Sequence, residues 1–399
     1  MRSRWNSSIP AANPKTIRAS AGRKSSCNKG GDCASLFRLL GLNTHLVNRN
    51  DPAMPQPRVS LPVFSVDPLL VSVRRGGAEE SLHLVDVVLC DADGSVVMGL
   101  GEVERMVFPR SAMKPLQALA LAERMTSLDP GLRLTPSELS LICASHNGQI
   151  EHVEGARALL ERFGLSPDLL SCGSQWSGDT PTMIEQARSM SAPERIHNNC
   201  SGKHSGMLVL GSLMGADPAG YADLSHPVQQ AILATLEFMT GIDITQFPSG
   251  IDGCGAPALS APLGNWARGF AMFAGGGQMP DSRTAACARL RDGIAAAPRM
   301  IAGDRRMCSA VAADFGSQIT AKTGAEGVYA AAFHDFGLGL MVKARDGNGR
   351  ASDAALGAVI HALGYDLPDA VRDFTEPELR NWAGQTVGEL RIEGPLALS

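Results

Sequence analysis

The sequence lacks the features that would place a protein in a membrane, on a nucleic acid or outside the cell. No apolar run approaches the roughly 18 residues that a transmembrane helix requires. The net charge is only -4 at pH 7, so neither nucleic acid nor an anionic membrane surface is expected as a partner. The nine cysteines are odd in number, and their scattered spacing is not that of a small secreted protein. These absences predict a cytoplasmic protein with reduced thiols.

Residues 1–57 are predicted to be a disordered N-terminal extension. Up to Asn50 there are nine lysines and arginines and a single acid, Asp32, and Ser, Asn, Gly and Pro are frequent. Such a composition buries too little apolar surface to offset the entropy lost on ordering. An early-assigned start, with Met54 as the true first residue, is favoured over an organellar transit peptide of similar composition. The remaining residues, 58–399, are enough for one large domain.

Strand and helix patterns begin near Pro62. Residues 84–91 and 96–101 are rich in β-branched side chains and flank the turn sequence Ala-Asp-Gly-Ser, which predicts a β-hairpin. The polar stretch 74–83 before it is interpreted as a solvated loop. Apolar residues at helical spacing predict further helices, and later β-branched runs predict strands. The predicted helices span 112–125, 136–141, 151–163, 207–213, 285–296 and 352–363, and the later strands are 338–344 and one that ends near 391.

A serine and a lysine three residues apart form the first candidate catalytic group. Ser111 and Lys114 stand at the head of the predicted helix 112–125. One helical turn would bring the hydroxyl within reach of the amine, and a desolvated, neutral lysine can take the proton of a serine nucleophile. The helix dipole would favour negative charge on the serine oxygen. The alternative is a serine N-cap with a solvated lysine, and Ser26–Lys29 matches the same motif in the extension.

Two later stretches add polar groups of the same kind. Ser145 and His146 end an apolar run and supply a candidate second hydroxyl and a candidate base, and Lys322 begins a Lys-Thr-Gly step beside a strand pattern. An early Ser-x-x-Lys followed by a late Lys-Thr-Gly is the order found in serine β-lactamases and penicillin-binding proteins. We therefore predict a serine amidohydrolase in which Ser111 attacks an amide carbonyl and Lys114 takes its proton. Ser145 and Lys322 would relay protons to the leaving amine.

Cysteine, lysine and histidine also lie close together in residues 197–208, where they could bind a metal ion. Chemistry alone favours Cys200, His204 and the distant Cys254 as ligands, because zinc prefers thiolate and imidazole. A lysine ligand would first have to lose its proton, which requires a large lowering of its pKa. The sequence has neither Cys-x-x-Cys nor His-Glu-x-x-His. Buried, inert cysteines therefore stay an open alternative.

Seven patches between residues 71 and 391 occur together in a fixed order, and the one around Cys200 is the most specific. They are Arg75-Gly76-Gly77 with Glu80-Ser81 and His83, Arg110–Pro115, Cys143–His146, Asn199–His204, Asp252–Cys254, Gly303–Arg305 with Cys308, and Ala321–Gly324. In this combination the chain resembles the Rhizobium-type L-asparaginases, also called asparaginase II or class 3. The resemblance covers nearly all of the predicted folded part.

The resemblance implies a fold like that of β-lactamases and penicillin-binding proteins. This is an α/β fold in which a mixed or antiparallel sheet is flanked by helices and joined to a mainly helical lobe. It also implies hydrolysis of L-asparagine to L-aspartate and ammonia by a homodimer, with a single catalytic domain over 58–399. The two Ser/Lys pairs, Ser111 with Lys114 and Ser145 with Lys322, would both be catalytic. Arg110 would lie beside the nucleophile, and Asp252 would orient the site.

The resemblance further implies a zinc ion bound by Cys200, Lys203 and Cys254. This zinc would tune substrate affinity without being needed for bond cleavage. His204 then gives up its place as a ligand and is expected to support the ligands and the substrate site. A glutaminase or penicillin-reactive hydrolase on the same scaffold, and a non-catalytic zinc-binding protein, remain open alternatives. The sequence does not decide which serine is acylated, because it offers two Ser/Lys pairs.

Overall fold

The computed structural model describes residues 54–398. The predicted extension 1–57 and the motif copy Ser26–Lys29 lie outside the described residues, apart from the last four positions of the extension. Arg58, the residue after these positions, is hydrogen-bonded to the C-terminal part of the domain. The backbone N–H of Arg58 donates to the carbonyl of Ala362 at 2.8 Å, and its guanidinium donates to the carbonyl of Tyr365 at 2.9 Å.

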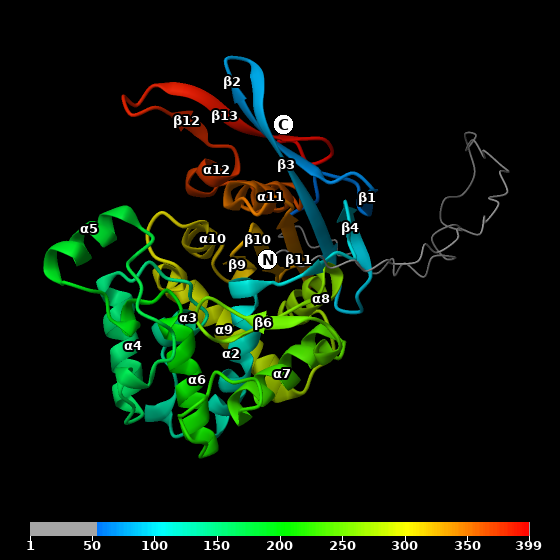
Figure 1. Ribbon diagram of the computed structural model, residues 1–399. Helices are drawn as coiled ribbons and strands as arrows, with labels where there is room; N and C mark the ends of the chain where they lie inside the picture. Colours follow the sequence, from blue (N-terminus) through cyan, green and yellow to red (C-terminus); the bar gives the residue numbers. More distant parts are fainter. Residues whose placement is uncertain (1–53, 399) are drawn as a thin grey trace, which may run out of the picture. The chain divides into compact units, whose positions relative to one another are not determined.

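A nine-stranded sheet forms the centre of the described domain (Figure 1). Its strands are β1 (Val63–Ser65), β2 (Leu69–Arg75), β3 (Ala78–Cys90), β4 (Val96–Leu100), β9 (Ile319–Gly324), β10 (Val328–Phe333), β11 (Leu338–Ala344), β12 (Glu378–Arg380) and β13 (Thr386–Glu393). The order is β12-β13-β2-β3-β11-β10-β9, with β4 beside β3. All pairs are antiparallel except β1 with β4, so the predicted mixed or antiparallel sheet is confirmed. Four short strands form two further pairs: β5 (Met106–Val107) with β8 (Ala261–Pro262), and β6 (Ser249–Ile251) with β7 (Pro257–Leu259).

The hairpin predicted for residues 84–101 is confirmed as the antiparallel pair β3–β4. The solvated loop predicted for residues 74–83 is wrong, because β2 continues to Arg75 and β3 begins at Ala78. Only Gly76 and Gly77 form the turn, with φ angles of 56° and 85° that glycine adopts without steric cost. The polar side chains beyond the turn lie on the exposed end of β3, where no buried face requires apolar residues.

Helices pack on the sheet and build a separate helical lobe (Figure 1). Helices α8 (Leu263–Phe273) and α11 (Gly349–Ala362) pack on the central strands β3, β10 and β11. In the lobe, α2 contacts α6, α7 and α9, and α3 contacts α4, α6 and α9, which confirms the predicted helical lobe. The remaining helices are α2 (Lys114–Ala122), α3 (Pro136–Ile142), α4 (Ile150–Arg162), α5 (Thr180–Ser189), α6 (Ser201–Met214), α7 (Pro227–Thr240), α9 (Asp281–Ala296), α10 (Met307–Phe315) and α12 (Asp369–Thr375).

Helices α2 and α6, which carry candidate site residues, begin elsewhere than the sequence predicts. Helix α6 begins at Ser201 instead of Met207, so polar residues that the apolar pattern leaves out form its first turns. Helix α2 is preceded by a 3₁₀ turn, Arg110–Met113, and therefore Ser111 lies in this turn. Pro115 occupies the first turn of α2, where its missing N–H leaves no helical hydrogen bond unmade.

The core lies on both faces of the central strands. Val87, Val88 and Leu89 are successive residues of β3, and all three are fully buried. Since successive side chains point to opposite faces of a sheet, this burial requires cover on both sides, which explains the unbroken apolar run. Within residues 54–398, no helix is long and apolar enough to cross a membrane.

Candidate active site

The Ser-x-x-Lys and Lys-Thr-Gly motifs lie side by side in the fold. Gly324, the last residue of β9, packs against the 3₁₀ turn that carries Ser111. A Cβ added at Gly324 would lie 2.5 Å from the carbonyl oxygen of Pro109 and 3.3 Å from the backbone nitrogen of Ala112. A side chain at this position would push the turn away. The glycine of Lys-Thr-Gly therefore allows the two motifs to pack closely against each other.

The hydroxyl of Ser145 lies between two lysine amines. The Nζ atoms of Lys114 and Lys322 are each 2.9 Å from Ser145 Oγ, and all three side chains are buried. Lys114 also donates to the carbonyl of Ala144 at 2.5 Å, and Lys322 donates to the carbonyl of Thr323 at 2.8 Å. A hydroxyl can donate one hydrogen bond and accept another, so Ser145 can pass a proton between the two amines.

Ser111 is not hydrogen-bonded to Lys114, although helical spacing predicts that contact. In the part of the chain that the structure describes, its hydroxyl makes no hydrogen bond, because the amine of Lys114 reaches across to Ser145 instead. Neither the 3₁₀ turn nor α2 has a side-chain cap, so Ser111 does not act as an N-cap. Its half-buried hydroxyl is therefore available to a substrate.

The amine of Lys322 is able to exchange a proton near neutral pH. Burial, together with the positive charges of Lys114 and Arg306, lowers its pKa to about 7, against the opposing effect of Cys308 and Cys200. A group with a pKa near the working pH is populated in both protonation states, as a general acid–base catalyst requires.

Arg110, the residue before Ser111, forms an ion pair with Asp252. Nε and Nη2 of Arg110 donate to the two carboxylate oxygens of Asp252 at 3.1 and 3.0 Å. Burial would raise the pKa of Asp252, but the hydrogen bonds and the charge of Arg110, together with the charge of Lys203 and the N–H of Gly253, lower it. The backbone of Arg110 has a φ of 52°, an uncommon conformation for a residue other than glycine and one that occurs often at functional sites.

Two cysteine side chains beside this centre are each hydrogen-bonded to a lysine amine. Lys203 Nζ is 3.0 Å from Cys254 Sγ, and Lys114 Nζ is 3.1 Å from Cys200 Sγ. A hydrogen bond from Cys254, together with the charges of Lys114 and Lys203, lowers the pKa of Cys200 well below its usual value. Burial would lower the pKa of Lys203, but the sulfur atoms of Cys200 and Cys254 outweigh burial and raise it.

This set of donors suits a zinc ion. Zinc binds sulfur and nitrogen tetrahedrally, and three protein ligands leave a fourth position for water or a substrate. The amine of Lys203 would have to release its proton when a metal binds, against the raised pKa that it has without a metal. Residues 54–398 contain no group of three or more His, Cys, Asp or Glu that could hold a metal ion, so a lysine ligand would be required.

The two histidines near the site have structural hydrogen bonds. His146 Nδ1 accepts the N–H of Gly148 at 3.0 Å, its Nε2 lies 3.0 Å from Ser201 Oγ, and burial holds its pKa well below the usual value. His204 Nδ1 lies 2.7 Å from the hydroxyl of Tyr221, and its buried Nε2 has no partner among the described residues. Burial also lowers the pKa of His204 well below its usual value. Among the described residues, neither ring is hydrogen-bonded to Lys114 or Lys322.

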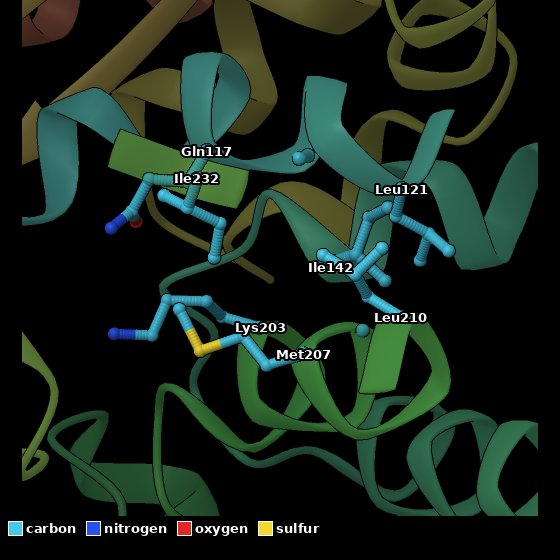
Figure 2. A pocket seen from close by; sticks show the side chains of 9 residues that line it. Gln117, Leu121, Ile142, Lys203, Met207, Leu210 and Ile232 are labelled. Atoms are coloured by element: carbon cyan, nitrogen blue, oxygen red, sulfur yellow. The ribbon is translucent and has the colours of Figure 1, made fainter. Parts of the chain in front are cut away.

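A small cavity lies beside Lys203, between α2 and α6 (Figure 2). Its volume is about 20 Å³, enough for about one water molecule. Neither Ser111 nor Ser145 lines it, so it is not the substrate site. The lining residues are Gln117, Ala118, Leu121, Ile142, Lys203, Gly206, Met207, Leu210 and Ile232.

One residue beside Ser145 has no signal in the sequence. Arg306 donates to the carbonyl of Ser145 at 3.3 Å and to the side chain of Asn147 at 2.8 Å. It follows the Gly-Asp-Arg patch and belongs to no spacing that chemistry would single out. Only the tertiary structure brings it to Ser145.

Comparison with known proteins identifies one family. The model of the family described as L-asparaginase II matches residues 71–392. None of the curated proteins matches the chain.

The solved structures to which the chain is similar, at low identity, include three that are named next. They are a D-alanine carboxypeptidase from Burkholderia cenocepacia (12% identity, TM-score 0.34, 72% of this chain and 90% of that one), a β-lactamase from Sulfitobacter sp. EE-36 (16%, 0.32, 77% and 90%) and a β-lactamase/D-alanine carboxypeptidase from Pseudomonas syringae (12%, 0.33, 76% and 94%). Similarity at this level carries no inference about substrate or mechanism.

Proposed function

Because the chain belongs to the L-asparaginase II family, we propose that it hydrolyses the side-chain amide of L-asparagine to L-aspartate and ammonia. The family supports an amidohydrolase of the asparaginase type. The observation that carries the catalytic assignment is the position of Ser145 Oγ, 2.9 Å from the amines of both Lys114 and Lys322. A buried hydroxyl bracketed by two amines serves proton transfer better than it serves stability, since burying amines is costly.

Acylation begins at Ser111, whose hydroxyl is free of protein partners among the described residues. Its oxygen forms a bond to the amide carbon, and its proton passes to Nζ of Lys114. Lys114 hands a proton to Ser145, whose own proton goes to the leaving nitrogen as the C–N bond breaks. Lys322 keeps the hydroxyl of Ser145 oriented and exchanges a proton with it. Ammonia leaves, and the β-carbonyl of aspartate remains as an ester on Ser111.

Deacylation reverses the proton path. A water molecule adds to the ester carbon while its proton moves into the chain of Lys114, Ser145 and Lys322. The ester C–O bond then breaks, the oxygen of Ser111 recovers a proton, and aspartate is released. The proton transfers between Ser145 and the two lysines run over the two 2.9 Å contacts.

Charge next to the turn supports an amino-acid substrate. A zwitterion presents one carboxylate and one ammonium group, and the pair of Arg110 and Asp252 offers one cation and one anion beside Ser111. Opposite charges held in place orient a small substrate against the nucleophile. We propose this pair as the part of the site that recognises the α-amino and α-carboxylate groups.

The proposal includes a zinc ion, a homodimer and a cytoplasmic location. Cys200, Lys203 and Cys254 would hold the metal, which would supply Lewis acidity near the substrate and tune its affinity. The seven cysteines among residues 54–398 are all free, as a reducing compartment would keep them. The homodimer follows from family resemblance alone.

An ammonia-release assay tests the proposal. Purified protein is given L-asparagine, L-glutamine or nitrocefin, with and without added zinc. We expect ammonia from asparagine, and its loss in Ser111→Ala and Ser145→Ala variants that keep the wild-type unfolding midpoint. Ser137→Ala changes an exposed serine of α3 and serves as the matched control.

Other results of this assay would favour a different function or a different nucleophile. Faster turnover of glutamine or nitrocefin would favour a different acyl hydrolase on this scaffold. Zinc binding through Cys200 and Cys254 without ammonia from any amide would favour a non-catalytic zinc protein. Full activity in a folded Ser111→Ala variant would overturn the assignment of the nucleophile.

A further inference from the structure

The hydroxyl between the two lysines is carried by a segment without regular secondary structure. We call residues 143–149 the Ser145 loop, and all but the first of them have neither helical nor strand geometry. Catalytic groups must be held to within about 0.5 Å, and loops achieve this only when other residues lock them in place. The residues that lock this loop therefore affect catalysis without touching a substrate.

One neighbouring segment holds the backbone of the loop. We call residues 299–306 the clamp segment. The N–H of Ser145 donates to the carbonyl of Ile301 at 3.1 Å, and the N–H of Asn147 donates to the carbonyl of Ala302 at 2.9 Å. These two bonds fix the position of the loop backbone relative to Ile301 and Ala302 of the clamp segment. They leave the carbonyl of Ser145 and the side chain of Asn147 to be fixed by other groups.

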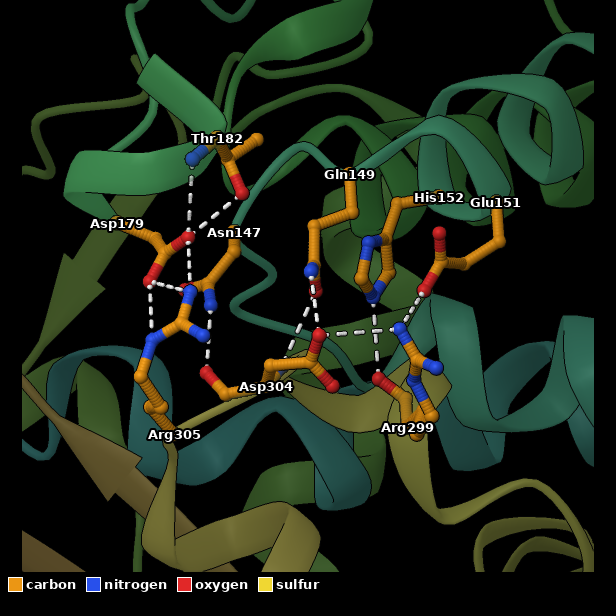
Figure 3. Close-up of polar contacts among 9 residues, drawn as sticks. All are labelled: Asn147, Gln149, Glu151, His152, Asp179, Thr182, Arg299, Asp304 and Arg305. Carbon is orange, nitrogen blue, oxygen red and sulfur yellow. Dashed lines mark hydrogen bonds and ion pairs between the residues drawn. The ribbon is translucent and has the colours of Figure 1, made fainter. Parts of the chain in front are cut away.

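Arg306 fixes both of these groups with one nitrogen. Its Nη1 donates to Asn147 Oδ1 at 2.8 Å and to the carbonyl oxygen of Ser145 at 3.3 Å. The amide nitrogen of Asn147 in turn donates to the carbonyl of Asp304 at 2.9 Å (Figure 3). Asn147 is 4% exposed, so both ends of its side-chain amide are satisfied inside the protein.

Arg306 differs from the other arginines of the clamp segment. Arg299 and Arg305 pair with carboxylates, and Figure 3 shows Arg305 bound to Asp179. Among the described residues, Arg306 donates hydrogen bonds only to the two neutral oxygens of the Ser145 loop. Hydrogen bonds from a charged donor are stronger than those from a neutral donor, so the guanidinium of Arg306 holds the Ser145 loop firmly.

We propose that Arg306, acting with Asn147, is a positioning residue that keeps the hydroxyl of Ser145 between the two lysine amines. This inference rests on the proposed function, since it assigns Ser145 the task of delivering a proton to the leaving nitrogen. An amine leaves an amide only with that proton, whereas an aryl oxide leaves an ester without it. A displaced Ser145 should therefore slow amide cleavage more than cleavage of an aryl ester.

The test compares two leaving groups in matched variants. The kcat and KM values are measured with L-asparagine and with an aryl ester of the aspartate β-carboxyl group. Arg306→Gln should lower kcat for the amide by about 10- to 100-fold, as misplacement of a catalytic group by about 1 Å does. Its KM for the amide and its kcat for the ester should stay within about threefold of wild type. Arg306→Lys, which keeps the charge and one donor, should recover part of the loss.

Two further variants separate positioning from general damage. Asn147→Ala removes the partner of Arg306 and should repeat the selective loss on the amide; it also serves if Arg306→Gln fails to fold. Arg305→Gln alters the adjacent residue, whose side chain is 57% exposed and bonds only Asp179 among the described residues, and should leave both rates within about twofold. Equal losses on amide and ester, or the same loss in Arg305→Gln, would overturn the proposal.

Hydrogen exchange tests the positioning role of Arg306 without relying on enzymatic activity. Amide exchange of the peptide that contains residues 143–149 is followed by mass spectrometry, and Arg306→Gln should exchange faster than both wild type and Arg305→Gln. If wild type releases no ammonia from asparagine, the proposed function fails, and the exchange rates still decide whether Arg306 holds the loop. Unchanged exchange in Arg306→Gln would overturn the positioning role.

Discussion

The rate of ammonia release is expected to rise with pH through about 7, because Lys322 must be neutral to accept a proton from Ser145. Burial lowers the pKa of Lys322 from 10.5 to about 7, and Lys114 and Arg306 act in the same direction. Below this pH the amine is charged and has no free electron pair for a proton. Above it the amine is neutral and accepts the hydrogen bond of the hydroxyl.

The size of the effect follows from the two pKa values. At pH 7 a lysine with a pKa of 10.5 would be neutral in about one molecule in 3,000, whereas Lys322 would be neutral in about half. The ratio kcat/KM should therefore fall about tenfold for each pH unit below about 6 and level off above about 8. Replacing Lys322 by arginine, which stays charged at every pH of interest, should lower turnover by about 10²- to 10⁴-fold.

The assay is kcat/KM for L-asparagine from about pH 5.5 to about pH 9 at constant ionic strength. Lys343→Arg, on the neighbouring strand β11, is the matched control and should keep the wild-type profile, because its amine bonds the carbonyl of Glu326 outside the site. A flat profile, or a rate that falls as pH rises through 7, would refute the role of Lys322. Wild-type turnover in Lys322→Arg would refute it as well.

Three further predictions concern the metal, the turn and the stability of the sheet. Cys254→Ala should lose bound zinc, measured by elemental analysis, and should show a raised KM with slower but surviving turnover; a metal content equal to wild type would show that Cys254 is no ligand. Gly324→Ala should lose most activity, because its Cβ would lie 2.5 Å from the carbonyl oxygen of Pro109, whereas Gly250→Ala, with nothing within 4 Å, should behave as wild type in the same ammonia assay. Asp86→Ala should lower the free energy of unfolding in urea by about 3 kcal/mol, because its fully buried carboxylate holds two arginines; a change below about 1 kcal/mol would contradict this.

Much of the fold could be predicted from local patterns. Strand β11 has the predicted bounds 338–344, and the helix predicted for residues 285–296 ends where α9 ends. In both, the period of the apolar residues matches the face that the fold buries. The sheet edge at residues 74–83 could not be predicted this way, because strand pairing there is set by the two-glycine turn while the side chains are solvated.

The start of α6 shows where propensity fails. Glycine and small polar residues lower the helix propensity of 201–206, yet these residues are helical and buried, including Lys203 and His204. Tertiary contacts with α2, α3 and α4 supply what propensity lacks. Of the candidate metal ligands, Lys203 therefore lies in this helix and Cys200 directly precedes it, a placement that the apolar pattern alone does not indicate.

By itself the sequence determined which residues could carry the chemistry. Ser111, Lys114, Ser145 and Lys322 stand out because nucleophiles and amines at motif spacing are uncommon inside apolar stretches. Helical spacing predicted a hydrogen bond between Lys114 and Ser111, whereas the amine bonds Ser145, since a pattern can only compare residues within a turn or two.

Only the tertiary structure decided that both lysines meet at Ser145 and that Arg306 holds its loop. These contacts join residues 31 to 177 positions apart in the chain. Their distances are set by how the sheet, α2 and the clamp segment pack together. Helix and strand propensities cannot predict these distances, because they depend on how the side chains of the whole core pack together.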